Sequence, residues 1–354
     1  MSITKVVLCG YYGKGNGGDE ALLVTLLQML PEDVQPIVLS GNPQETKKLY
    51  DVASCDRTSA FPILKALKQS DIFIWGGGSL MQDATSFASP IYYAGLMALA
   101  QQRGLTTIAW AQGIGPLKLP VTRWITRQTL LGCSAISVRD LASAELLTQW
   151  NLSPVVAPDP VWALRSSTVR GLSDFPAPRV AVVLRPHSCL TLPRLETLTQ
   201  ALVDFQAATN TFILLVPFQL SQDLEIAKHL ANKLGDNCSI IPLQDPTELK
   251  GLFKEVEMTI AMRLHGLIMA ASEGSRCYAL SYDPKVTQLM SELNLPGWKL
   301  TELPEDSQII SQAWIEHYTN GLALNEMQIQ SIVDRALLHQ QLLIQTINNR
   351  PSSG

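Results

Sequence analysis

Positively charged side chains follow several short apolar segments that have the composition of buried β-strands. Arg263 and His265 stand two residues apart after one such segment and before a helical pattern, so both can point the same way at a helix N-terminus. Cationic groups gathered in this way suit a ligand with carboxylate or phosphate oxygens. Four strand ends carry such residues, namely Arg139, Arg185 with His187, Arg263 with His265, and Lys285. The pattern predicts a site for a small, strongly anionic ligand.

The low overall charge makes this clustering informative. Of the 354 residues, 27 are Lys or Arg and 31 are Asp or Glu, so charged residues make up 16%, against about 25% in typical globular proteins. A single Arg is most often a surface cation paired with a neighbour, but a charge-poor chain has few of them. The net charge of −4 provides no broad cationic surface, which argues against a nucleic-acid partner.

Glycine-rich segments follow three predicted strands in the N-terminal half. Gly10–Glu20 contains a GxGxxG pattern, but the next strand does not end in the acidic residue that a dinucleotide site requires. This segment is either a loop whose amides face an anion or a tight turn with Asp19 as helix cap. Gly76–Ser79 and Gln112–Pro116 indicate a floor that a ligand touches closely. The candidate binding residues here are Gly78, Ser79, Gln112 and Gly113.

Two runs of alternating strand and helix patterns must position these residues. The predicted strands are 5–9, 35–39, 72–75, 106–110, 135–138 and 154–156, then 179–184, 211–216, 238–241, 258–261 and 277–281. Their continuous hydrophobicity is typical of parallel strands covered on both faces. We predict an α/β fold with two doubly wound Rossmann-like domains, 1–165 and 179–324, facing a cleft. A C-terminal helix is expected over 325–350.

The sequence contains no targeting or metal-binding pattern. No apolar stretch is long enough for a signal-peptide core or a membrane span. The six cysteines are scattered without a CxxC pair, which is typical of buried thiols in a reducing compartment. No cluster of His, Cys or Asp has the spacing of metal ligands. We therefore expect a cytoplasmic protein without a metal ion or cofactor.

Six motifs, taken in order, resemble those of a known family. They are Gly10-Tyr-Tyr-Gly with Gly18-Asp-Glu20, Trp75-Gly-Gly-Gly-Ser79, Gln112-Gly-Ile-Gly-Pro116, Ser137-Val-Arg-Asp140, Ala261-Met-Arg-Leu-His-Gly266 and Ser281-Tyr-Asp-Pro-Lys-Val286. Over roughly residues 5–290 the chain resembles the polysaccharide pyruvyltransferase family, most closely its CsaB branch, which serves bacterial cell-wall polysaccharide synthesis and S-layer anchoring.

The resemblance implies a fold similar to GT-B glycosyltransferases and a reaction with phosphoenolpyruvate. The pyruvyl group would pass to two hydroxyls of a sugar, usually N-acetylmannosamine on a lipid-linked precursor, and form a cyclic ketal. The family's donor-site positions align with Arg139, His265 and Lys285. Phosphoenolpyruvate is then a co-substrate, and no cofactor is implied.

The chemistry of this donor fits the residues at the strand ends. Its carboxylate and phosphate require converging cations, and ketal formation requires a proton at the methylene carbon while a sugar hydroxyl attacks. We assign His265 as the general acid and Lys285 to the departing phosphate. Arg139 and Arg263 would hold the anionic groups. The candidate bases for the sugar hydroxyl are Asp19 and Glu20.

Other function classes stay open. A GT-B glycosyltransferase could bind its nucleotide diphosphate at the basic strand ends, although no carboxylate stands where a ribose would lie. A non-catalytic carbohydrate-binding protein would have no use for the cations. His187 stands where relatives of the family often have an aromatic residue after Arg-Pro, so acceptor recognition is where this chain departs from the family.

A lipid-linked acceptor would bring the protein to a membrane surface. Leu117–Leu131 combines apolar and basic residues that suit peripheral contact, although an ordinary amphipathic helix is the simpler interpretation. The sequence leaves the oligomeric state open.

Overall fold

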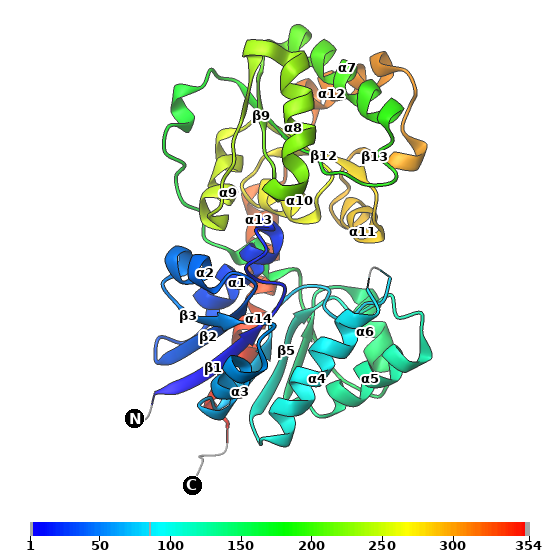
Figure 1. The fold of residues 1–354 in the computed structure, drawn as a ribbon. Coiled ribbons are helices and arrows are strands. Elements are labelled where there is room, and N and C mark those ends of the chain that lie inside the picture. The colour runs from blue at the N-terminus through cyan, green and yellow to red at the C-terminus, as the bar shows by residue number, and fades with distance from the viewer. Residues whose placement is uncertain (1–2, 85, 351–354) are drawn as a thin grey trace. The chain divides into compact units, whose positions relative to one another are not determined.

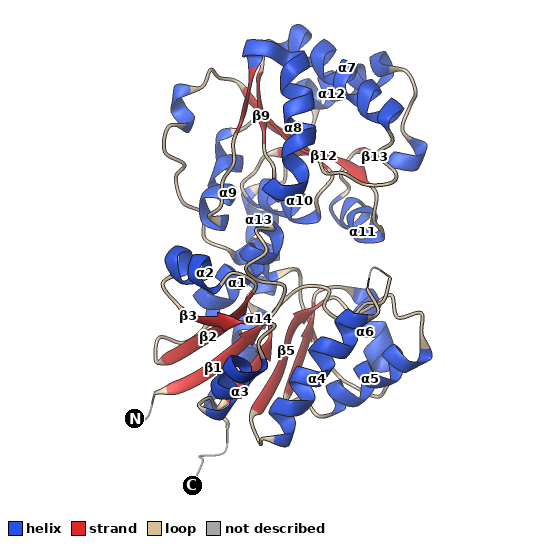
Figure 2. Cartoon of the chain, viewed as in Figure 1, coloured by secondary structure: helices blue, strands red, loops and turns tan. Residues whose placement is uncertain are grey.

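The computed structural model describes residues 3–84 and 86–350, which form two α/β units. The first unit contains the chain up to Lys14, Asp19–Leu164 and the C-terminal segment from Ser331. The second unit contains Gly15–Gly18 and Arg165–Gln330. Figure 1 follows the chain through both units, and Figure 2 shows that helices flank the strands in each. The chain therefore starts in the first unit and returns to it at its end.

A seven-stranded parallel sheet forms the centre of the first unit. Its strands are β1 (Thr4–Cys9), β2 (Val34–Ser40), β3 (Ala53–Asp56), β4 (Ile72–Trp75), β5 (Thr106–Gln112), β6 (Ala135–Val138) and β7 (Val155–Val156). They lie in the order β3-β2-β1-β4-β5-β6-β7. The intervening helices are α1 (Gly17–Met29), α2 (Pro43–Tyr50), α3 (Ala60–Lys68), α4 (Ala88–Gln102), α5 (Pro120–Leu131), α6 (Leu141–Thr148) and the 3-10 helix η1 (Pro160–Ala163).

The strand order of the first sheet reverses between β1 and β4, and this reversal places the loops after these two strands side by side. All four residues of β4, Ile72–Trp75, are buried, as expected for a strand covered by helices on both faces. Cys9, the last residue of β1, pairs in register with Trp75. The chain then continues to β2 on one side and from β4 to β5 on the other. Ligands of open α/β sheets bind at such a switch point, so the loops after Cys9 and Trp75 are candidate binding loops.

A six-stranded parallel sheet forms the centre of the second unit. Its strands are β8 (Arg179–Val183), β9 (Phe212–Leu215), β10 (Cys238–Ile240), β11 (Met258–Ala261), β12 (Arg276–Ser281) and β13 (Gly297–Lys299), in the order β10-β9-β8-β11-β12-β13. The longer helices are α7 (Leu192–Thr209), α8 (Leu220–Leu234), α9 (Pro246–Leu252), α10 (Leu264–Ser272), α11 (Pro284–Leu293) and α12 (Ser307–Asn320). Short 3-10 turns are η2 (Leu172–Asp174), η3 (Gly235–Asn237), η4 (Phe253–Glu255) and η5 (Leu300–Glu302). The order reverses between β8 and β11, where Val183 and Ala261 pair.

The C-terminal segment forms two helices rather than the single helix predicted over 325–350. These are α13 (Glu326–Ala336) and α14 (Leu338–Asn348). Leu337 between them has a ψ of −10°, which departs from α-helical geometry and interrupts the helix. Trp110 of β5 donates a hydrogen bond from Nε1 to the carbonyl oxygen of His339 over 3.2 Å. This bond attaches α14 to the first sheet.

No helix in the described part of the chain is long and apolar enough to cross a membrane. The basic, apolar segment around α5 is an amphipathic surface helix: Thr122 and Thr126 are buried, whereas the side chain of Trp124 is 60% exposed. Peripheral membrane contact through this segment stays a prediction.

Candidate functional site

The switch point of the second sheet places Arg263 beside an acidic partner. Arg263 precedes α10 and donates two hydrogen bonds to Asp223 of α8, from Nε to Oδ2 over 2.9 Å and from Nη2 to Oδ1 over 2.6 Å. Both side chains are buried, and Asp223 also accepts a hydrogen bond from the backbone of Gln219. The pair fixes the guanidinium, whose remaining nitrogen Nη1 forms no hydrogen bond with the described residues. The sequence patterns had not indicated Asp223.

His265 lies in the first turn of α10 against a glycine of the first loop. Gly18, which clusters with the second unit, leaves no room for a side chain, since a Cβ there would lie 2.2 Å from Nδ1 of His265. Gly17 donates a backbone hydrogen bond to the carbonyl of Phe218 over 2.7 Å. The glycines at 17 and 18 therefore let the backbone approach the loop after β9 and the start of α10 closely, next to the half-buried imidazole.

A second group of polar side chains lies at the ends of β8 and β12. Arg185 donates from Nη1 to the hydroxyl of Tyr282 over 3.2 Å and from Nη2 to Oε1 of Gln222 over 3.4 Å. The ring of His187 lies 4.6 Å from that of Tyr282, centroid to centroid. Lys285 lies in the first turn of α11, where its backbone N–H bonds to the cap residue Asp283. The cations predicted at these strand ends are thus at the carboxyl edge of one sheet, with Tyr282 and Gln222 added by the structure.

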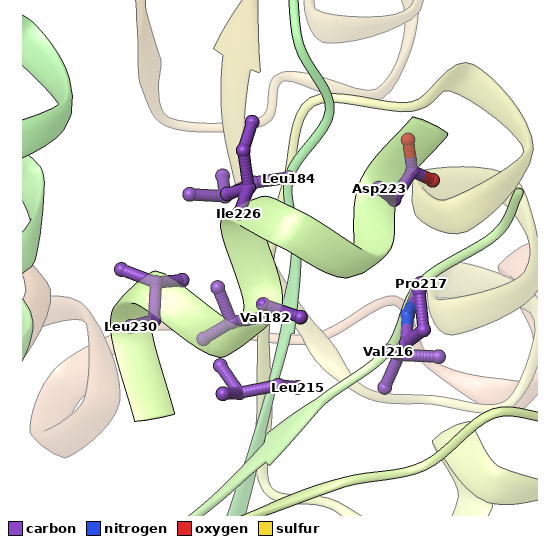
Figure 3. A pocket seen from close by; sticks show the side chains of 9 residues that line it. Val182, Leu184, Leu215, Val216, Pro217, Asp223, Ile226 and Leu230 are labelled. Atoms are coloured by element: carbon purple, nitrogen blue, oxygen red, sulfur yellow. The ribbon is translucent and has the colours of Figure 1, made fainter. Parts of the chain in front are cut away.

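A small cavity beside α8 is not a substrate site. Figure 3 shows aliphatic side chains of β8, β9 and α8 around it, with Asp223 at one side. It has room for about one water molecule, which is far less than a carboxylate–phosphate ligand requires. The candidate binding groups of the second unit lie outside this cavity, in the loops and first helical turns that follow the strands.

In the first unit, Arg139 is held by an acidic residue and a serine. Its Nη1 lies 2.5 Å from Oδ2 of Asp159, and its Nη2 donates to Oγ of Ser79 over 3.1 Å. Both ionic side chains are 7% exposed. A Cβ on Gly113 would lie 3.1 Å from Ser79 Oγ and 3.2 Å from Arg139 Nε, so glycine leaves space for the pair. The structure thus brings three of the predicted binding residues together, around a partner, Asp159, that the patterns had not indicated.

Two further predicted binding residues shape the floor of this site. The fully buried amide of Gln112 donates to the carbonyls of Gly76, over 2.6 Å, and Trp110, over 2.9 Å. Gly78 has a φ of 130°, which favours glycine, and its carbonyl accepts the N–H of Gly113 over 2.8 Å. These contacts bind the end of β5 to the loop after β4.

The two candidate bases have different surroundings. Glu20 is buried and accepts hydrogen bonds from the N–H groups of Gly13, over 2.8 Å, and Lys14, over 3.3 Å, and from the hydroxyl of Tyr50, over 3.1 Å. Burial raises the pKa of its carboxyl group to about 7, against the opposing effect of these hydrogen bonds. Asp19 is less buried, and its Oδ1 lies 3.9 Å from the position a Cβ would take on Gly78. Asp19 therefore faces the glycine floor, whereas Glu20 holds the first loop.

No three His, Cys, Asp or Glu side chains in the described ranges are arranged to hold a metal ion. The groups available for chemistry at the carboxyl edges of the two sheets are guanidinium, imidazole, ammonium and carboxylate groups.

Comparison with known proteins identifies the family. The model of the polysaccharide pyruvyl transferase family matches residues 16–284. No functionally curated protein matches the sequence. Among solved structures, the UDP-GlcNAc 2-epimerase of Neisseria meningitidis bound to UDP-GlcNAc is similar, with 10% identity and a TM-score of 0.65 over 98% of this chain and all of that one.

Two other solved structures extend this likeness. The UDP-GlcNAc 2-epimerase of Methanocaldococcus jannaschii, in complex with UDP-GlcNAc and UDP, has 11% identity and a TM-score of 0.59 over 94% of this chain and 99% of that one. A glycosyltransferase from Rickettsia africae has 13% identity and a TM-score of 0.60 over 99% and 100%. At such low identity these structures show the fold alone, which is GT-B-like as predicted. The family match covers most of the sequence, and the chain belongs to the polysaccharide pyruvyl transferase family of enzymes.

Proposed function

We propose that this enzyme transfers the pyruvyl group of phosphoenolpyruvate to two hydroxyls of a cell-wall polysaccharide sugar, giving a cyclic ketal and inorganic phosphate. The observation that carries the proposal is the family match over a segment that contains Arg139, Arg263 and His265. The presence of these cations at the carboxyl edges of the two sheets supports it, because the donor carries both a carboxylate and a phosphate.

The second unit would bind the donor. His265 and Lys285 lie in the first turns of the helices that follow β11 and β12, and Arg263 offers Nη1 because Asp223 fixes its other nitrogens. Arg185 adds a further guanidinium at the same edge. Arg139 of the first unit is the remaining donor ligand that the family pattern implies.

The reaction then proceeds by proton transfers that these side chains can perform. His265 protonates the methylene carbon, which becomes the methyl group, while the oxygen of a first sugar hydroxyl bonds to the central carbon. Asp19 takes the proton of that hydroxyl. A second hydroxyl of the same sugar then attacks the same carbon, the bond to the phosphate oxygen breaks, and the phosphate leaves with the second hydroxyl's proton. Lys285 stabilises the negative charge that develops on the leaving group.

The acceptor side of the proposal rests on the resemblance to the CsaB branch. Its motifs favour an N-acetylmannosamine residue on a lipid-linked precursor as the sugar that is modified. The first unit would bind it on the loops after β1, β4 and β5, where Gly78, Ser79 and Gly113 form the floor. A peripheral position at the cytoplasmic face of the membrane would follow from such an acceptor.

The test is release of phosphate from phosphoenolpyruvate with and without an acceptor that contains N-acetylmannosamine. We expect acceptor-dependent release that falls at least a hundredfold in His265→Ala and Arg139→Ala, a range typical of lost general-acid or oxyanion contacts. His229→Ala is the matched control, since His229 pairs with Glu196 on the surface of α8. Full turnover by His265→Ala would exclude the acid assignment.

A glycosyltransferase reaction is the second candidate, because the similar solved structures include a glycosyltransferase. The same preparation is therefore assayed with UDP-sugars. Turnover of a sugar nucleotide without any release of phosphate from phosphoenolpyruvate would favour this alternative.

A further inference from the structure

Arg57 lies at the carboxyl edge of the first sheet, enclosed by tyrosines. It follows Asp56, the last residue of β3, and is only 8% exposed. Its guanidinium carbon lies 5.4 Å from the ring centroid of Tyr11, 5.2 Å from that of Tyr92 and 5.5 Å from that of Tyr93. Nη2 donates to the hydroxyl of Tyr93 over 2.8 Å. The cation thus belongs to the same edge of the sheet as the glycine loop after β1.

No anionic side chain compensates the charge of Arg57 within the described residues. Its Nη1 is buried and forms no hydrogen bond. Burial raises the pKa of the nearby Cys9 thiol and that of Tyr92, each to about 12, so neither supplies a negative charge near neutral pH. An uncompensated cation at this depth is costly, and buried cations normally have partners.

The buried arginines at the other strand ends provide an internal comparison. Arg139 is paired with Asp159, and Arg263 with Asp223, each at hydrogen-bond distance. Arg57 is as buried as these residues, yet an aromatic enclosure stands in the place of a carboxylate. Two hydrogen bonds join Arg57 to α4, and neither uses Nη1: the hydroxyl of Tyr92 donates to the backbone carbonyl of Arg57 over 2.5 Å, and Nη2 of Arg57 donates to the hydroxyl of Tyr93. The side chain of Arg57 is therefore left with a donor for a group from outside the protein.

Tyr11 is the solvent-exposed member of the tyrosine enclosure around Arg57. Its ring stands over the guanidinium and is 44% exposed, whereas Tyr93 is buried beneath. The exposed ring suits stacking on the apolar face of a sugar, which would bring an attached oxyanion close to the guanidinium.

We propose that Arg57 and Tyr11 form a subsite for an oxyanion, a carboxylate or a phosphate, carried by the acceptor saccharide. The proposal rests on the proposed function in taking a saccharide as the acceptor. Nη1 of Arg57 would donate to the oxyanion, and the Tyr11 ring would pack on the sugar that carries it. Neither residue is among the groups assigned to phosphoenolpyruvate. The subsite would therefore act in recognition of the acceptor, by favouring saccharides that carry an oxyanion.

The test is direct binding, which does not require turnover. Dissociation constants are measured by ligand-observed NMR for N-acetylglucosamine 1-phosphate and glucuronic acid, each against its neutral parent, N-acetylglucosamine or glucose. We expect at least about tenfold tighter binding of one anionic sugar by the wild type, and which one it is identifies the oxyanion. Arg57→Gln should abolish this preference, Arg57→Lys should keep part of it, and Tyr11→Ala should weaken both members of the pair.

Two controls make the outcome decisive. Arg103→Gln removes the same charge from an exposed position of the first unit and should bind as the wild type does. Saturating phosphoenolpyruvate should leave the anionic sugar bound, because Arg57 and Tyr11 are not among the groups assigned to the donor. If Arg57→Gln does not fold, as judged by circular dichroism, Arg57→Lys and the surface variant Tyr11→Ala carry the same comparison.

Several results would overturn the subsite. These are equal binding of anionic and neutral sugars by the wild type, a preference that survives in Arg57→Gln, or displacement of the sugar by phosphoenolpyruvate. The proposed function is tested separately by phosphate release. Arg57-dependent binding without any release would leave the subsite standing and reject pyruvyl transfer, whereas normal release with no preference would do the reverse.

Discussion

At the residue scale, Gly18 decides where His265 can lie. A Cβ at this position would fall 2.2 Å from Nδ1 and 2.9 Å from Cγ of the imidazole, so Gly18→Ala must displace the ring. Because Ala is a good helix former and position 18 lies in the first turn of α1, we expect little loss of thermal stability. Phosphate release should nevertheless fall at least about tenfold, since His265 is the proposed general acid and a small displacement of a catalytic group is costly.

A second Gly→Ala substitution, at Gly95, serves as the control for Gly18→Ala. Gly95 is an exposed interior residue of α4, and a Cβ there has no neighbour within 4 Å. Gly95→Ala should keep full activity and gain about 0.4–1 kcal/mol in free energy of unfolding. Wild-type turnover by Gly18→Ala would show that the imidazole position does not matter to the reaction.

Glu20 should give the stability of the protein a pH dependence. Its carboxyl pKa is raised from 4.5 to about 7, so the folded state retains a proton that the unfolded state releases in this interval. The contribution of Glu20 to the free energy of unfolding is therefore complete below pH 4.5 and decreases as the pH rises to about 7, by no more than about 3 kcal/mol. Thermal unfolding of wild type and Glu20→Gln between pH 4.5 and 8 should diverge in this direction, and parallel curves would contradict it.

At the element scale, His339 connects α14 to two segments of the first unit. It is fully buried; Nε2 lies 3.0 Å from the carbonyl oxygen of Pro158, and Nδ1 lies 2.9 Å from Oγ of Ser137. A carbonyl only accepts, so Nε2 carries the hydrogen and Nδ1 accepts from the serine hydroxyl. Pro158 precedes Asp159 and Ser137 lies two residues before Arg139, so the imidazole supports the segments that carry this ion pair.

This arrangement predicts a pH effect opposite in sign to that of Glu20. Burial lowers the pKa of His339 to about 4, so the unfolded state binds a proton between about pH 6.5 and 4 that the folded state does not. The contribution of His339 is complete above pH 6.5 and is lost as the pH falls towards 4. His339→Gln keeps a donor for Pro158, and its urea unfolding at pH 5 and pH 7 should lack this part of the pH dependence. An unchanged difference between the two pH values would refute the neutral imidazole.

The sequence predicted the central strands of both sheets well and missed two short strands. Segments such as Ile72–Trp75 and Met258–Ala261 are central strands, and their continuous hydrophobicity gave their bounds correctly. The strands β3 and β13 were missed, because their short sequences, Ala-Ser-Cys-Asp and Gly-Trp-Lys, contain no run of β-branched or aliphatic residues. Periodicity carries little information for such strands.

The residues of the candidate site could be predicted only in part. Arg139, Arg263 and His265 could be named as candidates because they closely follow strands, where ligands of α/β sheets bind. Their partners Asp159 and Asp223 could not, since each lies at least 20 residues away in sequence and only the folded chain brings it near. Arg57 follows a strand that was itself missed, so its position gave no signal.

At the scale of the whole molecule, the C-terminal helix α14 belongs to the core of the first unit although it follows the second in sequence. Leu343 is fully buried there and packs in one cluster with Val6 and Leu8 of β1, whereas its neighbour Ile344 is 37% exposed. Leu343→Ala should therefore destabilise the first unit by about 2–5 kcal/mol, and Ile344→Ala by less than about 1 kcal/mol. The second unit has its own core around Phe205, so we expect amide exchange to accelerate in β1, β4 and β5 and to stay unchanged in β8 and β11. Equal acceleration in both sheets would mean that the two units unfold as one cooperative body, and no acceleration would mean that α14 contributes nothing to the core in which its side chains lie.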